Sequence, residues 1–164
     1  MSQQPSRSAS IDRRTGETDI KVTLELDGTG SVNADTGVPF LDHMLDALGR
    51  HGRMNLLVTA TGDAAMDPHH TVEDTGIAVG QALREALGDR KGIERYGHAY
   101  APPDEALARV VVDISGRPYF EMHASMPEAV IGPDFAASLV EEFWRSLCTN
   151  AGLSVHIDLL RARN

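Results

Sequence analysis

A short run of histidine and acidic residues is the part of this chain best suited to chemistry. His69, His70 and Glu73 stand together just after a proline. Neighbours on a helix diverge by about 100°, so the two histidines cannot easily chelate one ion together, although either can share a face with Glu73. The spacing suits two metal ions, one per imidazole, with Glu73 completing one shell. Nitrogen and oxygen ligands without sulfur fit zinc, iron or manganese. The alternative is a histidine-containing helix start that merely faces solvent.

A helix over about residues 68–87 must position this group. Asp67 is a good N-cap, and Pro68 suits the first helical position, where no amide donor is needed. Apolar or small residues then recur at helical spacing, and Gly88 marks the end. These recurring residues are Val72, Gly76, Val79, Leu83 and Leu87.

The whole chain has the composition of one globular domain. It has 164 residues, of which 41% are hydrophobic, and a formal net charge of −9. The negative charge argues against nucleic acid as the main partner. The single cysteine, Cys148, lies in an apolar helical stretch, so packing is a better interpretation than nucleophilic catalysis. With no membrane-length apolar run and no signal-peptide core, we expect a cytoplasmic protein.

The remaining elements follow from hydrophobic periodicity. Residues 1–10 are rich in Ser and Gln and are interpreted as a flexible tail, while residues 89–105 are interpreted as a connector rich in Gly, Pro and charge. His43 lies on the edge of a helix over 40–49, where a histidine is often just a polar flank. The other predicted elements are strands over 19–27, 54–62, 108–114, 119–125 and 153–160 and a helix over 135–149.

Two arginines stand at turns beside strands. Arg95 lies in the connector, and Arg117 follows the strongly apolar strand at 108–114. A guanidinium at such a place is a natural anion contact because it matches phosphate oxygens bidentately. The alternative is that both are ordinary surface charges.

An internal repeat emerges from these elements. Residues 22–28 resemble 110–116, and residues 40–45 can be laid on 139–144. We therefore expect residues 11–164 to form one domain of two pseudo-repeats, about 17–95 and 96–164. Each half is predicted to run strand, strand, helix, strand, helix, with the last helix of the second half missing.

Three motifs together resemble those of the imidazoleglycerol-phosphate dehydratases, enzymes of histidine biosynthesis. They are residues 40–45 (FLDHML), 69–74 (HHTVED) and 113–119 (DISGRPY). The resemblance implies an α/β fold of the two-layer α+β kind, similar to ribosomal protein S5 domain 2, in which each half packs a four-stranded sheet on helices. It also implies self-association as trimers that build a shell of about 24 subunits, with manganese sites between subunits.

The resemblance assigns roles to particular residues. It implies two manganese ions per active site, and the matching ligands are His43, His69, His70 and Glu73. Glu17 matches the acid–base glutamate, and Arg95 and Arg117 match arginines that hold the substrate phosphate. The implied reaction is removal of water from imidazole glycerol phosphate to give imidazole acetol phosphate.

Two departures from the family pattern leave other readings open. Glu142 stands where the repeat partner of His43 is usually a histidine, although a carboxylate can also bind manganese. The family's second His-His-x-x-Glu helix would begin shortly after Asn164, so we expect a C-terminally incomplete chain with little turnover and reduced assembly. The alternative function is a degenerate or partial homologue that binds metal or partner subunits without turnover. A metallopeptidase helix would carry its histidines and glutamate in a different order, with a histidine at the position of Asp74.

Overall fold

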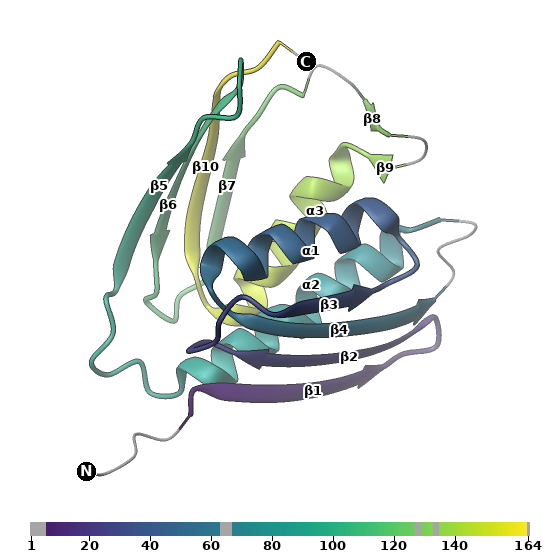
Figure 1. Cartoon of the computed structure of the whole chain (residues 1–164), viewed down its shortest axis with the longest axis vertical. Helices are drawn as coiled ribbons and strands as arrows, with labels where there is room; N and C mark the ends of the chain where they lie inside the picture. The colour runs from purple at the N-terminus through teal and green to yellow at the C-terminus, as the bar shows by residue number, and fades with distance from the viewer. Residues whose placement is uncertain (1–5, 63–66, 127–128, 133–134, 164) are drawn as a thin grey trace.

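The computed structural model describes residues 6–62, 67–126, 129–132 and 135–163, which form two sheets and three helices (Figure 1). The helices are α1 (Pro39–Gly52), α2 (His69–Leu87) and α3 (Ser138–Ala151). The strands of the first sheet are β1 (Ser8–Arg14), β2 (Thr18–Glu25), β3 (Val32–Asp35) and β4 (Asn55–Gly62). Those of the second are β5 (Tyr96–Ala101), β6 (Leu107–Asp113), β7 (Tyr119–His123) and β10 (Ser154–Arg161). The short strands β8 (Val130–Ile131) and β9 (Phe135–Ala136) pair with each other.

The two sheets have the same topology. Their strand orders are β1-β2-β4-β3 and β5-β6-β10-β7. In each sheet the last strand in this order pairs parallel to its neighbour, and the remaining pairs are antiparallel. Helices α1 and α3 occupy equivalent places along the chain: α1 connects the parallel strands β3 and β4, and α3 comes between the parallel strands β7 and β10. The predicted fold class, a duplicated α/β unit of four-stranded sheets packed on helices, is confirmed.

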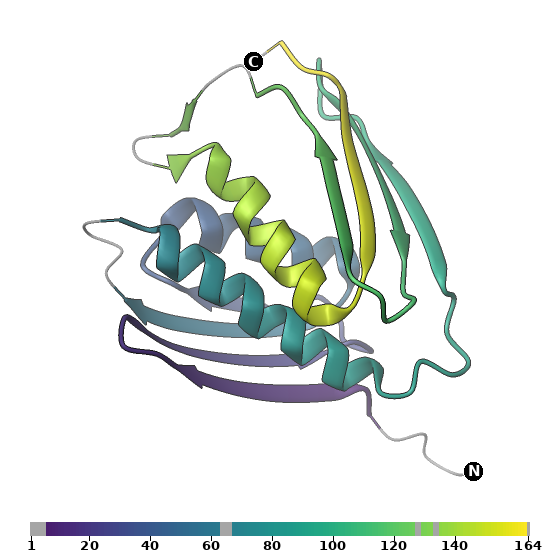
Figure 2. The ribbon, with the colours of Figure 1, turned by 180° about the vertical axis from the view of Figure 1, so that it is seen from behind.

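The helices lie between the two sheets and share one hydrophobic core (Figures 1 and 2). Alternate residues of β2 and β4 point into it, and Val155 enters it from the second sheet. Helices α2 and α3 pack closely because Gly76 and Gly80 have no side chain. A Cβ on Gly80 would lie 2.5 Å from the carbonyl oxygen of Leu147, closer than such atoms can approach.

Two predictions about local structure were wrong. Ser8–Ser10, taken as part of a flexible tail, belong to β1, so the first repeat begins before residue 17. The predicted connector contains β5, whose residues are all exposed. Both strands are sheet edges, where burial on one side is incomplete and the alternation that reveals a strand is weak. Each half therefore starts with one strand more than predicted.

Two expectations about the chain as a whole can be compared with the described residues. Cys148 is fully buried in α3, and burial raises the pKa of its thiol to about 12, so its packing role is confirmed. None of the helices in the described ranges is long and apolar enough to cross a membrane.

Candidate functional site

The His-rich segment forms the first turn of α2, as its spacing predicted. The backbone N–H of His69 donates to Oδ1 of Asp67 at 2.9 Å, and the N–H of Val72 donates to the carbonyl of Pro68 at 2.9 Å. Asp67 thus satisfies an amide that the helix itself leaves without a partner. The first turn is fixed while its histidine side chains remain half exposed.

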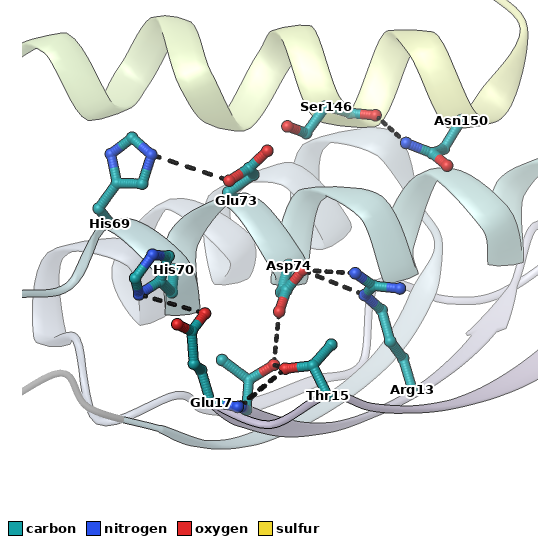
Figure 3. A network of polar contacts seen from close by, with 10 residues as sticks. Arg13, Thr15, Glu17, His69, His70, Glu73, Asp74, Ser146 and Asn150 are labelled. Atoms are coloured by element: carbon teal, nitrogen blue, oxygen red, sulfur yellow. Dashed lines mark hydrogen bonds and ion pairs between the residues drawn. The ribbon is translucent and has the colours of Figure 1, made fainter.

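The two histidines diverge and take different carboxylate partners (Figure 3). His69 Nε2 lies 3.7 Å from Oε2 of Glu73, one helical turn later. His70 Nδ1 lies 3.6 Å from Oε2 of Glu17, which stands in the turn between β1 and β2. The imidazole rings are nearly perpendicular, with centroids 5.8 Å apart. Sequence spacing allowed Glu73 to pair with either histidine, and in the structure it pairs with His69.

Each pair has the chemistry and the spacing to share one cation. Two ligand atoms that each bind a metal at about 2.0–2.2 Å are at most about 4.4 Å apart, so both observed separations fit. Imidazole nitrogen and carboxylate oxygen suit manganese, iron or zinc. All four side chains are between 41% and 60% exposed, so solvent and ligands can reach them. Within the described ranges, however, no three His, Cys, Asp or Glu side chains gather closely enough to hold an ion together.

Beside these pairs, Asp74 ties α2 to the β1–β2 hairpin. Its Oδ1 accepts hydrogen bonds from Arg13 Nε at 3.2 Å and Nη2 at 2.7 Å, and its Oδ2 accepts one from the Thr18 hydroxyl at 2.5 Å (Figure 3). Burial alone would raise the pKa of Asp74. The hydrogen bonds from Thr18 and Arg13, with the guanidinium charge, outweigh burial and hold that pKa below its ordinary value. Asp74 is therefore a carboxylate at neutral pH.

The other predicted ligands, His43 and Glu142, are not joined to these pairs by any described contact. Both helices that carry them have 14 residues, and each residue stands four positions after the first, at Pro39 and Ser138. They therefore occupy equivalent places in the two halves. His43 is exposed, and Glu142 is half buried.

Of the two predicted phosphate-binding arginines, Arg95 is bound to the carboxylate of Asp113 at the end of β6, and the charge of Arg117 acts on the same carboxylate. Arg95 donates to both oxygens of Asp113, from Nε at 2.6 Å and from Nη2 at 2.9 Å, and its guanidinium lies 4.9 Å from the centre of the Tyr96 ring. The hydrogen bonds from Arg95, with the charges of Arg95 and Arg117, outweigh desolvation and lower the pKa of Asp113. Arg117 follows in the β6–β7 turn and is exposed. The pair makes a small positive site in an acidic protein.

The arginines and the histidines lie at opposite ends of α2. Helices α2 and α3 run in the same direction, because Gly76 meets Phe143 and Gly80 meets Leu147. The β6–β7 turn is held at the last residues of α3, where the Gly116 N–H donates to the Gly152 carbonyl at 2.9 Å. The 19 residues of α2 span about 28 Å, so one chain does not place its arginines beside its own histidines.

Sequence reasoning missed the residues that support the site. The sequence showed Asp74 within the His-rich segment but gave no sign of its partners Arg13 and Thr18, which come from two other strands. Likewise, nothing in the sequence connected Arg95 with Asp113. The one available signal was charge, since a carboxylate on a packed helix needs a cationic or hydroxyl partner.

Comparison with known proteins identifies a family. The family model described as imidazoleglycerol-phosphate dehydratase matches residues 36–164. A protein of that name from Ralstonia nicotianae is 56% identical over 159 residues, which cover 97% of this chain and 81% of the relative, and one from Geobacter sulfurreducens is equally similar. The crystal structure of imidazoleglycerol-phosphate dehydratase from Staphylococcus aureus superposes with a TM-score of 0.85 at 42% identity, covering 96% of this chain and 86% of that one. The structure from Pyrococcus furiosus gives 0.80 at 36% identity, with 94% and 81% covered.

Proposed function

Since the chain belongs to the imidazoleglycerol-phosphate dehydratase family, we propose that it removes water from imidazole glycerol phosphate to give imidazole acetol phosphate, a step of histidine biosynthesis. The observation that carries the proposal is the pair of imidazole–carboxylate groups at the start of α2. His69 faces Glu73, and His70 faces Glu17, at 3.7 and 3.6 Å.

We propose that these residues hold manganese, with His69, His70 and Glu73 as ligands. A bound divalent cation would act as a Lewis acid and a template for the substrate imidazole. The imidazole–carboxylate donor set and the 3.7 Å separation of His69 and Glu73 fit such an ion. Within one copy, His69 and Glu73 supply two protein ligands to one ion and His70 supplies one to the other, fewer than the about three that a catalytic metal usually has. His43 and Glu142 are the candidates to complete the shells, from other copies of the chain.

Glu17 is proposed as the acid–base group. Dehydration removes a hydroxyl group from one carbon and a hydrogen from another, so a group that both accepts and donates a proton is required. The Glu17 carboxylate is 60% exposed and stands beside His70, where substrate can reach it.

Arg117 and Arg95 are proposed to bind the substrate phosphate. Asp113 orients Arg95 through two hydrogen bonds, and Arg117 stands nearby in the turn. A fixed phosphate converts binding energy into orientation of the reacting end. Because the arginines lie about 28 Å along α2 from the histidines of the same chain, the complete site requires at least two copies of the chain. This supports self-association of the chain, which we propose takes place as trimers, as the family resemblance implies.

The test is turnover of imidazole glycerol phosphate with added Mn²⁺, in the wild-type chain and in Glu17→Gln. We expect low but measurable turnover in the first and a loss of about a hundredfold or more in the second. A chain that binds Mn²⁺ without any turnover would favour the alternative, a homologue that retains metal binding only. Glu142 at the place equivalent to His43 is the observation that favours that alternative.

A further inference from the structure

We propose that Asp74 is a positioning residue for Glu17, acting through the hydroxyl groups of Thr18 and Thr15. The proposal rests on the function proposed above, which gives Glu17 its acid–base role. Asp74 accepts hydrogen bonds from Arg13 and Thr18 and makes no described hydrogen bond to either histidine–carboxylate pair.

The Glu17 side chain is weakly held by its own contacts. Its described side-chain contact is the ion pair with His70, at 3.6 Å, and the carboxylate is 60% exposed. An exposed ion pair of this length contributes little to order. The direction in which the carboxylate points therefore depends on the backbone of the three-residue turn, 15–17, that joins β1 to β2.

A directed chain of hydrogen bonds holds that backbone. The N–H groups of Glu17 and Thr18 both donate to the Thr15 hydroxyl oxygen, at 3.2 and 3.0 Å. The Thr15 and Thr18 hydroxyl oxygens are 3.1 Å apart, and Thr18 contacts Oδ2 of Asp74 at 2.5 Å. A carboxylate only accepts, so Thr18 must donate to Asp74, and Thr15 must donate to Thr18. Each bond in such a chain polarises the next, and Asp74 sets the direction of all of them.

The Asp74 carboxylate, which ends this series of hydrogen bonds, is buried and held by further contacts. Asp74 is 8% exposed, sits on the second turn of α2, and is clamped by Arg13 from β1. Gly62 closes the opposite side of the turn, since a Cβ there would lie 3.1 Å from Thr18 Cγ2 and 3.3 Å from the Glu17 carbonyl oxygen. The Asp74 side chain therefore links helix α2, at a position four residues after His70, to the turn that carries Glu17.

The key variant is Thr18→Val, which keeps the shape of the side chain and removes the hydroxyl that joins Asp74 to the turn. Thr18→Ser, which restores a hydroxyl, is the rescue variant. Thr75→Val is the matched control, because Thr75 is a fully buried threonine on α2 whose hydroxyl has no hydrogen-bond partner among the described residues. Four quantities are measured for each: kcat and KM for imidazole glycerol phosphate, Mn²⁺ affinity by calorimetry, and hydrogen exchange of the Glu17 and Thr18 amides.

The expected result is selective. Thr18→Val should lower kcat about tenfold to a hundredfold while KM and Mn²⁺ affinity stay within about twofold, because a misplaced group costs rate without removing a binding contact. Its Glu17 and Thr18 amides should exchange at least about tenfold faster. Thr18→Ser should recover most of kcat, and Thr75→Val should leave all four quantities unchanged.

Other outcomes overturn the proposal. Wild-type kcat and wild-type amide exchange in Thr18→Val would show that the hydroxyl chain does not position Glu17. An equal loss in Thr75→Val would attribute the effect to general packing. If Thr18→Val does not fold, Thr15→Val breaks the same chain one bond nearer Glu17 and is judged by the same criteria. A Glu17→Gln protein with full turnover would instead refute the acid–base role of Glu17. Amide exchange in Thr18→Val would then still test the other half of the proposal: wild-type exchange rates would show that Asp74 does not order the turn.

Discussion

The most specific consequence of the structure is that two inactive variants should restore each other. The histidine pairs lie at the start of α2, and Arg117 lies beyond its far end, about 28 Å away along the helix. A site that uses both must take His70 from one chain and Arg117 from another. His70→Ala and Arg117→Ala each disable one of these contributions, and a mixture contains both intact residues on different chains.

The size of the recovery follows from the geometry. In an equal and random mixture, half of the chains carry an intact His70 and the other half an intact Arg117. A site built from two different chains is then fully intact in about a quarter of cases, so activity should approach about one quarter of wild type. If one chain supplied both residues, none of the sites would be intact.

The assay compares the turnover rates of the mixture, the two separate variants and the wild type at a substrate concentration below KM. At that concentration the rise in KM caused by loss of Arg117 lowers the rate most. The two variants are treated with a chelator, mixed, and supplied with Mn²⁺ so that subunits exchange. A mixture of His70→Ala with the His70→Ala/Arg117→Ala double variant is the control, because it contains no intact His70. Mixed oligomers that show no more activity than the average of the two separate variants would refute the inference that the site spans two chains.

Three further predictions concern single residues. His70→Ala should weaken Mn²⁺ binding measured by calorimetry, and equal affinity in variant and wild type would remove His70 from the ligand set. Arg117→Ala should raise KM for the phosphorylated substrate about tenfold or more, since one charge-assisted contact contributes roughly 1.5–3 kcal/mol, while equal effects on a dephosphorylated analogue would make Arg117 an ordinary surface charge. Asp74→Asn should lower the free energy of unfolding at pH 7 by about 1.5–3 kcal/mol in denaturant titrations. Because the folded pKa of Asp74 is lowered, its contribution is complete above the unfolded pKa of about 3.9 and is lost as the pH falls through the folded value. The difference between wild type and variant should therefore shrink below about pH 4, and a difference that does not change with pH would contradict this account.

The parts of the structure that the sequence predicted are those determined by local chemistry. Asp67, Pro68 and the apolar spacing that follows specify where α2 begins and which residues stand on its first turns. The interior strands β2, β4 and β6 were predicted because one face of each packs on the core. Edge strands β1 and β5 were missed because incomplete burial leaves little alternation to detect.

The parts that escaped prediction depend on contacts between distant segments. His70 meets Glu17 only because the β1–β2 hairpin packs beside α2, and spacing along the helix carries no information about that contact. The same holds for Asp74 with Arg13 and Thr18. The resemblance to a family named Glu17 as an acid–base residue, and the structure adds the neighbours that could orient it.

The measurement that tests the central claim most directly is turnover of imidazole glycerol phosphate by the purified chain, with Mn²⁺ added after chelation. We predict that imidazole acetol phosphate forms, that its formation depends on Mn²⁺, and that Glu17→Gln lowers its rate about a hundredfold or more without changing Mn²⁺ affinity. A chain that binds Mn²⁺ with its His69 and His70 ligands yet forms no product under any of these conditions would contradict the proposed function.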